Sequence, residues 1–280
     1  MDTMTASDPG VPMGDSRLLH EVTGTGDPIV LVPGILTGWA SWKDHAERLA
    51  HRHTVVRVQP RSVELAEAGE PIPPDYSIGM ERDALLATVD ALGLERFDLA
   101  GWSLGGGVGL AFALEYPERV RTLTLIEPEA PWVLRATGHA AEALAAATAF
   151  DHDFARRETI TIEDLKNFLV RAGIGDPDTD FESHPRWPLM AQNRQALSTI
   201  GAISSFTDSL DRLRALDVPI LAVRGTDSTE TDIAITEDIV AMAPDARLLK
   251  LPGDHSCFLQ HPDQFLTALE KHIAAAAGGG

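Results

Sequence analysis

Short runs rich in aliphatic residues recur along the chain, and segments with helical spacing separate them. The runs lie at 29–34, 54–58, 96–101, 120–128, 218–225 and 246–253. The run at 29–34 is uninterrupted as far as its final Pro-Gly. Runs of this length are typical of strands buried on both faces. Their alternation with helices predicts an α/β fold: a mostly parallel, doubly wound sheet with helices on both faces. A further strand and a glycine-rich hairpin turn are expected over 17–28.

The segments between the runs carry apolar residues at helical spacing. Helices are predicted over 41–50, 77–93, 104–115 and 234–243, with a last helix that opens at Pro262. Ser41 and Ser77 are candidate N-caps for the first two of these helices. Residues 60–76 are rich in Pro and Glu and are expected to form an irregular connection.

Residues 129–215 interrupt the alternation, because they contain helical segments and no buried-strand run. One of these helices has Thr161 as its expected cap. A helical insertion between two strand–helix units is most simply a lid (cap) over the carboxyl edge of the sheet, where such sheets bind ligands. The expected organisation is a disordered tail at 1–15, a core at 16–128, a helical cap at 129–215, the second part of the core at 216–275, and a flexible tail at 276–280.

Composition narrows the class of partner. The chain has 280 residues, with 23 Lys and Arg against 42 Asp and Glu, and a formal net charge of −19. A surface with this excess of negative charge repels nucleic acid and anionic membranes. Neither is therefore an expected partner. Cys257 is the single cysteine, which excludes an internal disulfide and a thiolate zinc cluster. A small-molecule substrate, no metal, no cofactor and a monomer or homodimer are expected.

The N-terminal residues show neither a basic nor an apolar signal region, and no apolar run approaches the roughly 20 residues of a membrane span. A cytoplasmic protein is therefore expected.

One predicted strand leads into Gly101-Trp102-Ser103-Leu104-Gly105, and a predicted helix follows. This is the setting of a nucleophile elbow, in which a sharp turn exposes a serine and glycines remove clashing side chains. The amide of Leu104 lies at a helix N-terminus and can donate to a developing oxyanion. The competing interpretation is a glycine-rich turn that cradles phosphate, but no Gly-Lys-Ser/Thr continuation is present.

A serine hydroxyl needs a general base, and His255 is the candidate. It lies in "LPGDHSCF", just after the last predicted strand, and therefore at the same carboxyl edge as Ser103. His45, His51 and His53 flank a predicted surface helix, and nothing in the pattern marks them for chemistry. Cys257 is expected to be a small buried hydrophobe.

With these motifs in place, the chain resembles the α/β-hydrolase superfamily. The segments that carry the resemblance are "EVTGTGDPIVLVPG", "GWSLGG", "YPERVRTLTLI", "VPILAVRG" and "LPGDHSCFLQHPDQF". The resemblance implies a second oxyanion donor, the amide of Ile35, although Pro33-Gly34 replaces the usual His-Gly. A serine nucleophile argues against the dehalogenase and epoxide-hydrolase branches, which use aspartate at this position.

The acid of the implied triad is ambiguous. The family's usual Gly-x-x-Asp would place it at 228, where this chain has serine, with Asp227 immediately before. Asp227 stands at a typical spacing from His255 and is the preferred candidate. The alternative is Glu127, at the end of the preceding core strand, because some family members take their acid from there. Glu230 and Asp232 are further alternatives.

Aromatic and basic residues near the expected mouth are candidates for substrate binding: Trp39, Trp102, Trp132, Trp187 and Arg61. The tryptophans could wall an apolar pocket, or pack lid against core. Arg61, like Arg135, could anchor a carbonyl or carboxylate, or pair with acidic neighbours.

The predicted function is serine hydrolysis of a small to medium, largely apolar carboxylic ester or lactone through an acyl-enzyme. Carbon–carbon bond hydrolysis, acyl transfer or a lyase step on the same triad is an alternative. A ligand sensor on a hydrolase scaffold is an alternative of another class.

Overall fold

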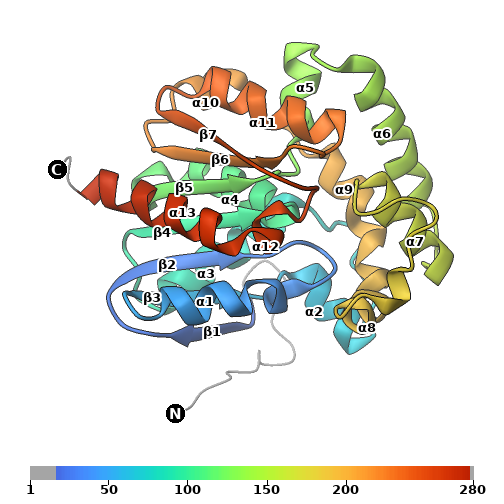
Figure 1. Cartoon of the computed structure of the whole chain (residues 1–280), viewed down its shortest axis with the longest axis horizontal. Coiled ribbons are helices and arrows are strands. Elements are labelled where there is room, and N and C mark those ends of the chain that lie inside the picture. The colour runs from blue at the N-terminus through green and yellow to red at the C-terminus, as the bar shows by residue number, and fades with distance from the viewer. Residues whose placement is uncertain (1–16, 278–280) are drawn as a thin grey trace.

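The computed structural model describes residues 17–277, and its centre is one seven-stranded sheet (Figure 1). The strand order is β1-β3-β2-β4-β5-β6-β7. Only β1 runs antiparallel to its neighbour, and all other pairs are parallel. The strands are β1 (His20–Thr23), β2 (Asp27–Val32), β3 (His53–Val58), β4 (Phe97–Trp102), β5 (Val120–Ile126), β6 (Ile220–Gly225) and β7 (Ala246–Leu251).

Helices cover both faces of this sheet, which confirms the predicted α/β class. The α-helices are α1 (Lys43–Leu49), α2 (Arg61–Ala68), α3 (Ile78–Ala91), α4 (Leu104–Glu115), α5 (Pro131–Thr137), α6 (Ala141–Phe154), α7 (Ile162–Arg171), α8 (Trp187–Asn193), α9 (Ile200–Ser205), α10 (Leu210–Arg214), α11 (Glu230–Met242), α12 (Cys257–Gln260) and α13 (Pro262–Ala277). Short 3₁₀ helices lie at η1 (Gly38–Trp42), η2 (Pro117–Arg119), η3 (Phe181–Ser183) and η4 (Arg194–Thr199).

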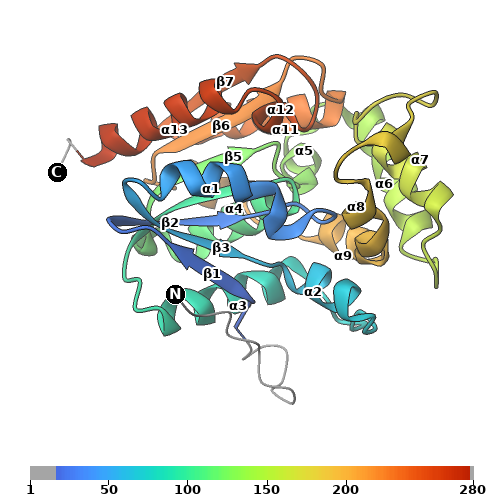
Figure 2. The ribbon, with the colours of Figure 1, turned by 60° about the horizontal axis from the view of Figure 1, so that its bottom comes forward.

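The continuous apolar strands feed two separate cores, because successive side chains of a strand point to opposite faces. In β2, Ile29 belongs to the core that includes residues of α1 and α13, whereas Val30 belongs to the core that includes residues of α3, α4 and α11. Figure 2 shows α3 and α13 on opposite sides of the sheet. Neighbouring residues of one apolar strand therefore contribute alternately to the two cores.

Helices α5 to α10 occupy the connection between β5 and β6, where the sequence predicts a helical insertion. Helices α6, α7 and α8 gather at the end of the molecule away from the C-terminus (Figure 1). The side chain of Thr161 accepts a hydrogen bond from Asp164 N–H, as expected of a cap of α7. Whether these helices act as a separate cap domain stays a prediction.

Four local predictions are wrong. Residues 60–76 contain α2, which ends at Gly69 in the left-handed conformation. The first two strands form no hairpin, because β1 pairs with β3. Ser41 does not cap α1; its hydroxyl donates to Gly38 O within η1. His45 lies within α1 rather than flanking it, and it is buried because its ring packs against aromatic side chains, among them Phe258.

The chain ends were predicted to form tails. The tail expected at 1–15 lies outside the described residues, as do 278–280 of the tail expected at 276–280. Residues 276–277 form the end of α13 rather than a tail. None of the helices within 17–277 combines the length and apolar character needed to cross a membrane.

Candidate active site

Four chain segments that follow parallel strands meet at one edge of the sheet. Ile35 follows β2, Ser103 follows β4, Glu127 follows β5, and His255 lies in the loop after β7. Parallel strands present their carboxyl ends at the same edge, and ligands bind there in open α/β sheets. The fold itself therefore gathers residues that are far apart in the sequence.

Ser103 forms a strained turn between β4 and α4. Its φ is 56° and its ψ is −118°, a conformation that costs free energy in a residue with a Cβ. Its N–H donates to Ile126 O at 2.9 Å, which fixes the turn against β5. A Cβ on Gly101 would lie 2.1 Å from Gly105 O, so the turn closes only with glycine at that position. The hydroxyl of Ser103 makes no hydrogen bond within residues 17–277.

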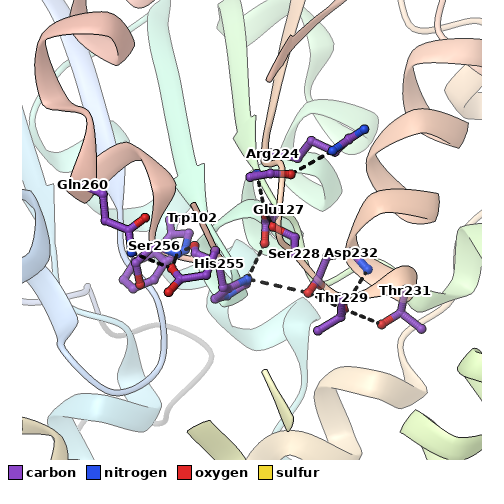
Figure 3. A network of polar contacts seen from close by, with 12 residues as sticks. Trp102, Glu127, Arg224, Ser228, Thr229, Thr231, Asp232, His255, Ser256 and Gln260 are labelled. Carbon is purple, nitrogen blue, oxygen red and sulfur yellow. Dashed lines mark hydrogen bonds and ion pairs between the residues drawn. The ribbon is translucent and has the colours of Figure 1, made fainter. Parts of the chain in front are cut away.

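His255 is buried and bonded to a carboxylate (Figure 3). Its Nδ1 lies 2.7 Å from Glu127 Oε2. The other oxygen of Glu127 accepts hydrogen bonds from Gly225 N–H at 2.6 Å and from the Ser228 hydroxyl. Glu127 itself has a φ of 41°, a second strained non-glycine residue in the site. The strained backbone and the donors of the β6 loop hold this carboxylate against the imidazole.

The preferred sequence candidate for the acid, Asp227, is not the carboxylate that contacts His255. Its side chain is exposed, and its N–H donates to Gly253 O at 2.9 Å. Within residues 17–277, the carboxylates that lie within 4 Å of His255 Nδ1 belong to Glu127 and to Asp232, whose Oδ2 is 3.9 Å away. The structure thus brings the alternative candidate, Glu127, to the imidazole.

Trp102 positions the histidine loop from the opposite side. Its indole Nε1 donates to His255 O at 2.9 Å, and the two rings have centroids 5.7 Å apart. Because Trp102 is the last residue of β4, this bond couples the loop of the imidazole to the strand that carries Ser103.

The charges around His255 change its proton affinity. Burial disfavours the imidazolium, but the hydrogen bond to Glu127 and the charges of Glu127, Asp232 and Glu129 outweigh it and raise the pKa of His255 to about 9. Burial likewise disfavours the Glu127 anion, yet its contacts with His255 and the donors Gly225 and Ser228 lower its pKa. The pair is therefore stabilised as an ion pair at neutral pH.

Two backbone amides near Ser103 have no hydrogen-bond partner within residues 17–277, those of Ile35 and Leu104. Leu104 is the first residue of α4, where N–H groups lack an acceptor in the preceding turn. Ile35 lines a cavity together with Ser103. Both amides are thus available to a bound oxygen atom.

The site consists of an inner and an outer cavity. The inner cavity has a volume of about 40 Å³, and Ser103, His255, Glu129, Arg171 and Asp232 line it together with apolar side chains. The outer cavity has a volume of about 600 Å³ and is largely apolar. Leu36, Trp102 and Ile174 line both cavities, so the inner one adjoins the outer one.

Of the five residues predicted to bind substrate, Trp102 lines these cavities and the other four do not. Trp132, in α5, is buried in the hydrophobic core, and the ring of Trp187 lies 5.8 Å from Lys166 Nζ. Trp39 lies near β3, where its N–H donates to the Gln59 side chain. Arg61 is buried and paired with Glu64 at 2.7 Å, a structural role.

Sequence reasoning missed several side chains of the inner cavity, among them Glu129, Phe168, Arg171 and Ile174. Glu129 had a usable signal, since it is the second acid in the Glu-Pro-Glu segment that follows β5. Arg171 and Ile174 come from the end of α7 and the segment after it, and no strand-end rule places them.

Glu127, Asp232 and His255 offer ligand atoms within 4.8 Å of one another, which is close enough for a metal ion. The same Nδ1 and carboxylate oxygen, however, form the bond between His255 and Glu127. A metal ion would have to replace that bond.

Comparison with known proteins shows which family this fold belongs to. A family model described as the alpha/beta hydrolase fold matches residues 27–262. A protein of Azorhizobium caulinodans, named as a candidate carbamate hydrolase, is 28% identical over 270 residues, which cover 90% of this chain and 93% of that protein. A pimeloyl-[acyl-carrier protein] methyl ester esterase of Aliivibrio salmonicida is 26% identical, with 92% and 96% covered.

Two further matches are a hydrolase that is similar over part of its length and a hydrolase of known structure. A 2-hydroxy-6-oxo-2,4-heptadienoate hydrolase of Pseudomonas putida is 38% identical over 112 residues, 39% of each chain. The crystal structure of a hydrolase from Pseudomonas aeruginosa superposes with a TM-score of 0.73 at 26% identity, covering 91% of this chain and 94% of that one.

Proposed function

Because this chain belongs to the alpha/beta hydrolase family, we propose that it is a serine hydrolase that cleaves a carboxylic ester or lactone with Ser103, His255 and Glu127. The observation that carries the proposal is the inner cavity, because Ser103 and His255, which is bonded to Glu127, line the same small space. The family alone does not select a substrate, because the fold supports many chemistries.

In the proposed mechanism, His255 removes the proton of Ser103 as the hydroxyl attacks the substrate carbonyl. Glu127 holds the imidazole through Nδ1 and stabilises its charged form. The amides of Ile35 and Leu104 donate to the tetrahedral oxyanion, and one such donor is typically worth about 3 kcal/mol of barrier. His255 then protonates the leaving group, and water hydrolyses the acyl-enzyme.

The sizes of the cavities support a substrate with one short and one larger side. About 40 Å³ beside Ser103 takes a group of only a few heavy atoms. About 600 Å³ of largely apolar space takes the larger part of the molecule. The ester specificity named for the Aliivibrio relative agrees with this chemistry.

Turnover of esters tests the proposal. We expect the protein to hydrolyse p-nitrophenyl acetate and propionate faster than the octanoate, because the inner cavity is small. A fluorophosphonate probe should label Ser103 covalently, as mass spectrometry of the tryptic peptide would show. A protein that neither turns over any ester nor reacts with the probe would instead be a ligand sensor on this scaffold.

The pH dependence follows from the raised pKa of His255. The imidazole must be neutral to accept the proton of Ser103, and its pKa lies above the ordinary 6.5, at about 9. We therefore expect kcat/KM for an uncharged ester to rise with pH from neutral pH toward about 9. Substituting the exposed His139 with alanine should leave this profile unchanged. A rise centred below 6.5 would contradict the proposed ion pair.

Carbon–carbon bond hydrolysis is a second candidate. It is favoured by the 38% identity to the Pseudomonas putida hydrolase, although that match covers only 39% of the chain. Turnover of a vinylogous diketone acid, in the absence of ester turnover, would select this reaction.

A further inference from the structure

Glu129 lies beside the nucleophile without taking part in the triad. Its N–H donates to Ser103 O at 3.0 Å, so the residue is tied to the strained turn itself. A Cβ on Gly107 would lie 2.5 Å from Glu129 O, which shows how closely this backbone lies against α4. The residue is half-buried and lines the inner cavity with Ser103 and His255. Its carboxyl group is therefore held within reach of the reaction space.

This carboxyl group has no hydrogen bond and no cation within 4 Å in the part of the chain that the structure describes. The neighbouring acids differ in this respect. Glu127 bonds His255, and Asp232 accepts a hydrogen bond from the Thr229 hydroxyl at 2.6 Å. Leaving a half-buried carboxylate without a partner costs free energy. Glu129 and Asp232 both line the inner cavity, and of the two only the carboxyl group of Glu129 lacks a partner among the described residues.

Arg171 also lines the inner cavity, but it pairs with a different acid. Its Nη2 lies 3.4 Å from Asp151 Oδ1, and its guanidinium lies 5.1 Å from the ring of Phe150. Burial and the charges of Asp232 and Asp151 raise the pKa of Glu129 to about 7, although Arg171 and His255 oppose the rise. Several carboxylates around one paired arginine make the inner cavity unfavourable for an anionic group.

We propose that Glu129 is a specificity-determining residue that binds a polar hydrogen of the substrate, on a hydroxyl or ammonium group next to the scissile carbonyl. This inference rests on the proposed function and names its substrate class: esters whose short side carries an O–H or N–H group. Such a group supplies the missing partner of the carboxyl group. A plain alkyl group would leave Glu129 unpaired, and sites built around a polar contact reject analogues that lack it.

The test compares three p-nitrophenyl esters of similar size: lactate with a hydroxyl, alaninate with an ammonium group, and propionate with neither. Wild-type kcat/KM should favour lactate or alaninate over propionate by more than the ratio of their alkaline hydrolysis rates. Substituting Glu129 with leucine should lower kcat/KM for the favoured ester by about 10–100-fold relative to that for propionate, a ratio in which any effect common to all esters through His255 cancels. The matched control is Glu142→Leu, at an exposed glutamate of α6, which should change none of the three.

Glu129→Gln separates the two kinds of substrate. An amide still bonds a hydroxyl, so retained selectivity for lactate indicates a hydroxyl, whereas loss of selectivity for alaninate indicates an ammonium group. Equal losses for all three esters would show a structural role and overturn the proposal. The absence of any selectivity in the wild-type protein overturns it without a variant. Absence of turnover for all three esters is a different result, because it contradicts the proposed function itself.

Discussion

Substituting Ser103 with alanine is expected to lower kcat for p-nitrophenyl acetate by about 10⁴–10⁶-fold. The hydroxyl is the only group of the proposed mechanism that bonds to the substrate carbon, so the acyl-enzyme cannot form without it. Residual rate above the reaction in water would come from the amides of Ile35 and Leu104 and from binding. Labelling by a fluorophosphonate probe should disappear with the activity.

The fold of this variant is expected to persist, because alanine fits the space of serine and the hydroxyl of Ser103 makes no hydrogen bond within residues 17–277. Thermal denaturation measures this directly. The matched control is Ser205→Ala, at an exposed serine of α9, which should keep wild-type kinetics. More than about a tenth of wild-type kcat in Ser103→Ala would mean that another group carries the reaction.

The sequence was sufficient to predict the sheet and to select Ser103 and His255 as candidates. Buried strands leave continuous apolar runs, and a residue just after such a run must lie at the carboxyl edge of a parallel sheet. The position of a residue relative to a strand end is given by the sequence alone. It can therefore be predicted without knowing where any side chain points.

The acid was harder to predict, because Asp227 and Glu127 both follow strands that end at this edge. What separates them is backbone conformation. Glu127 adopts a φ of 41°, and the Gly225 N–H then bonds its carboxylate. A positive φ in glutamate has no signature in the sequence. Arg171 was missed for a different reason: it lies at the end of α7, in a helical insertion whose packing follows no strand-end rule.

Substituting Glu127 with glutamine is expected to lower kcat/KM by about 10³–10⁴-fold, whereas Asp227→Asn should change it by less than about threefold. The amide keeps the size of the side chain but removes the charge that stabilises the imidazolium. It can also present an N–H to Nδ1, which would favour the wrong tautomer of His255. Asp227 is exposed and is not among the carboxylates within 4 Å of the imidazole, so its variant is the matched control.

The pH profile distinguishes loss of this role from a general disturbance of the site. The hydrogen bond and charge of Glu127 raise the pKa of His255 against its burial, so removing the charge should move the rising limb of kcat/KM to lower pH. A merely misfolded site would lose activity without that shift. If Asp227→Asn instead lost the activity and Glu127→Gln retained it, the acid would be Asp227, and the loop after β6 would have to rearrange to bring its carboxylate to His255 during catalysis.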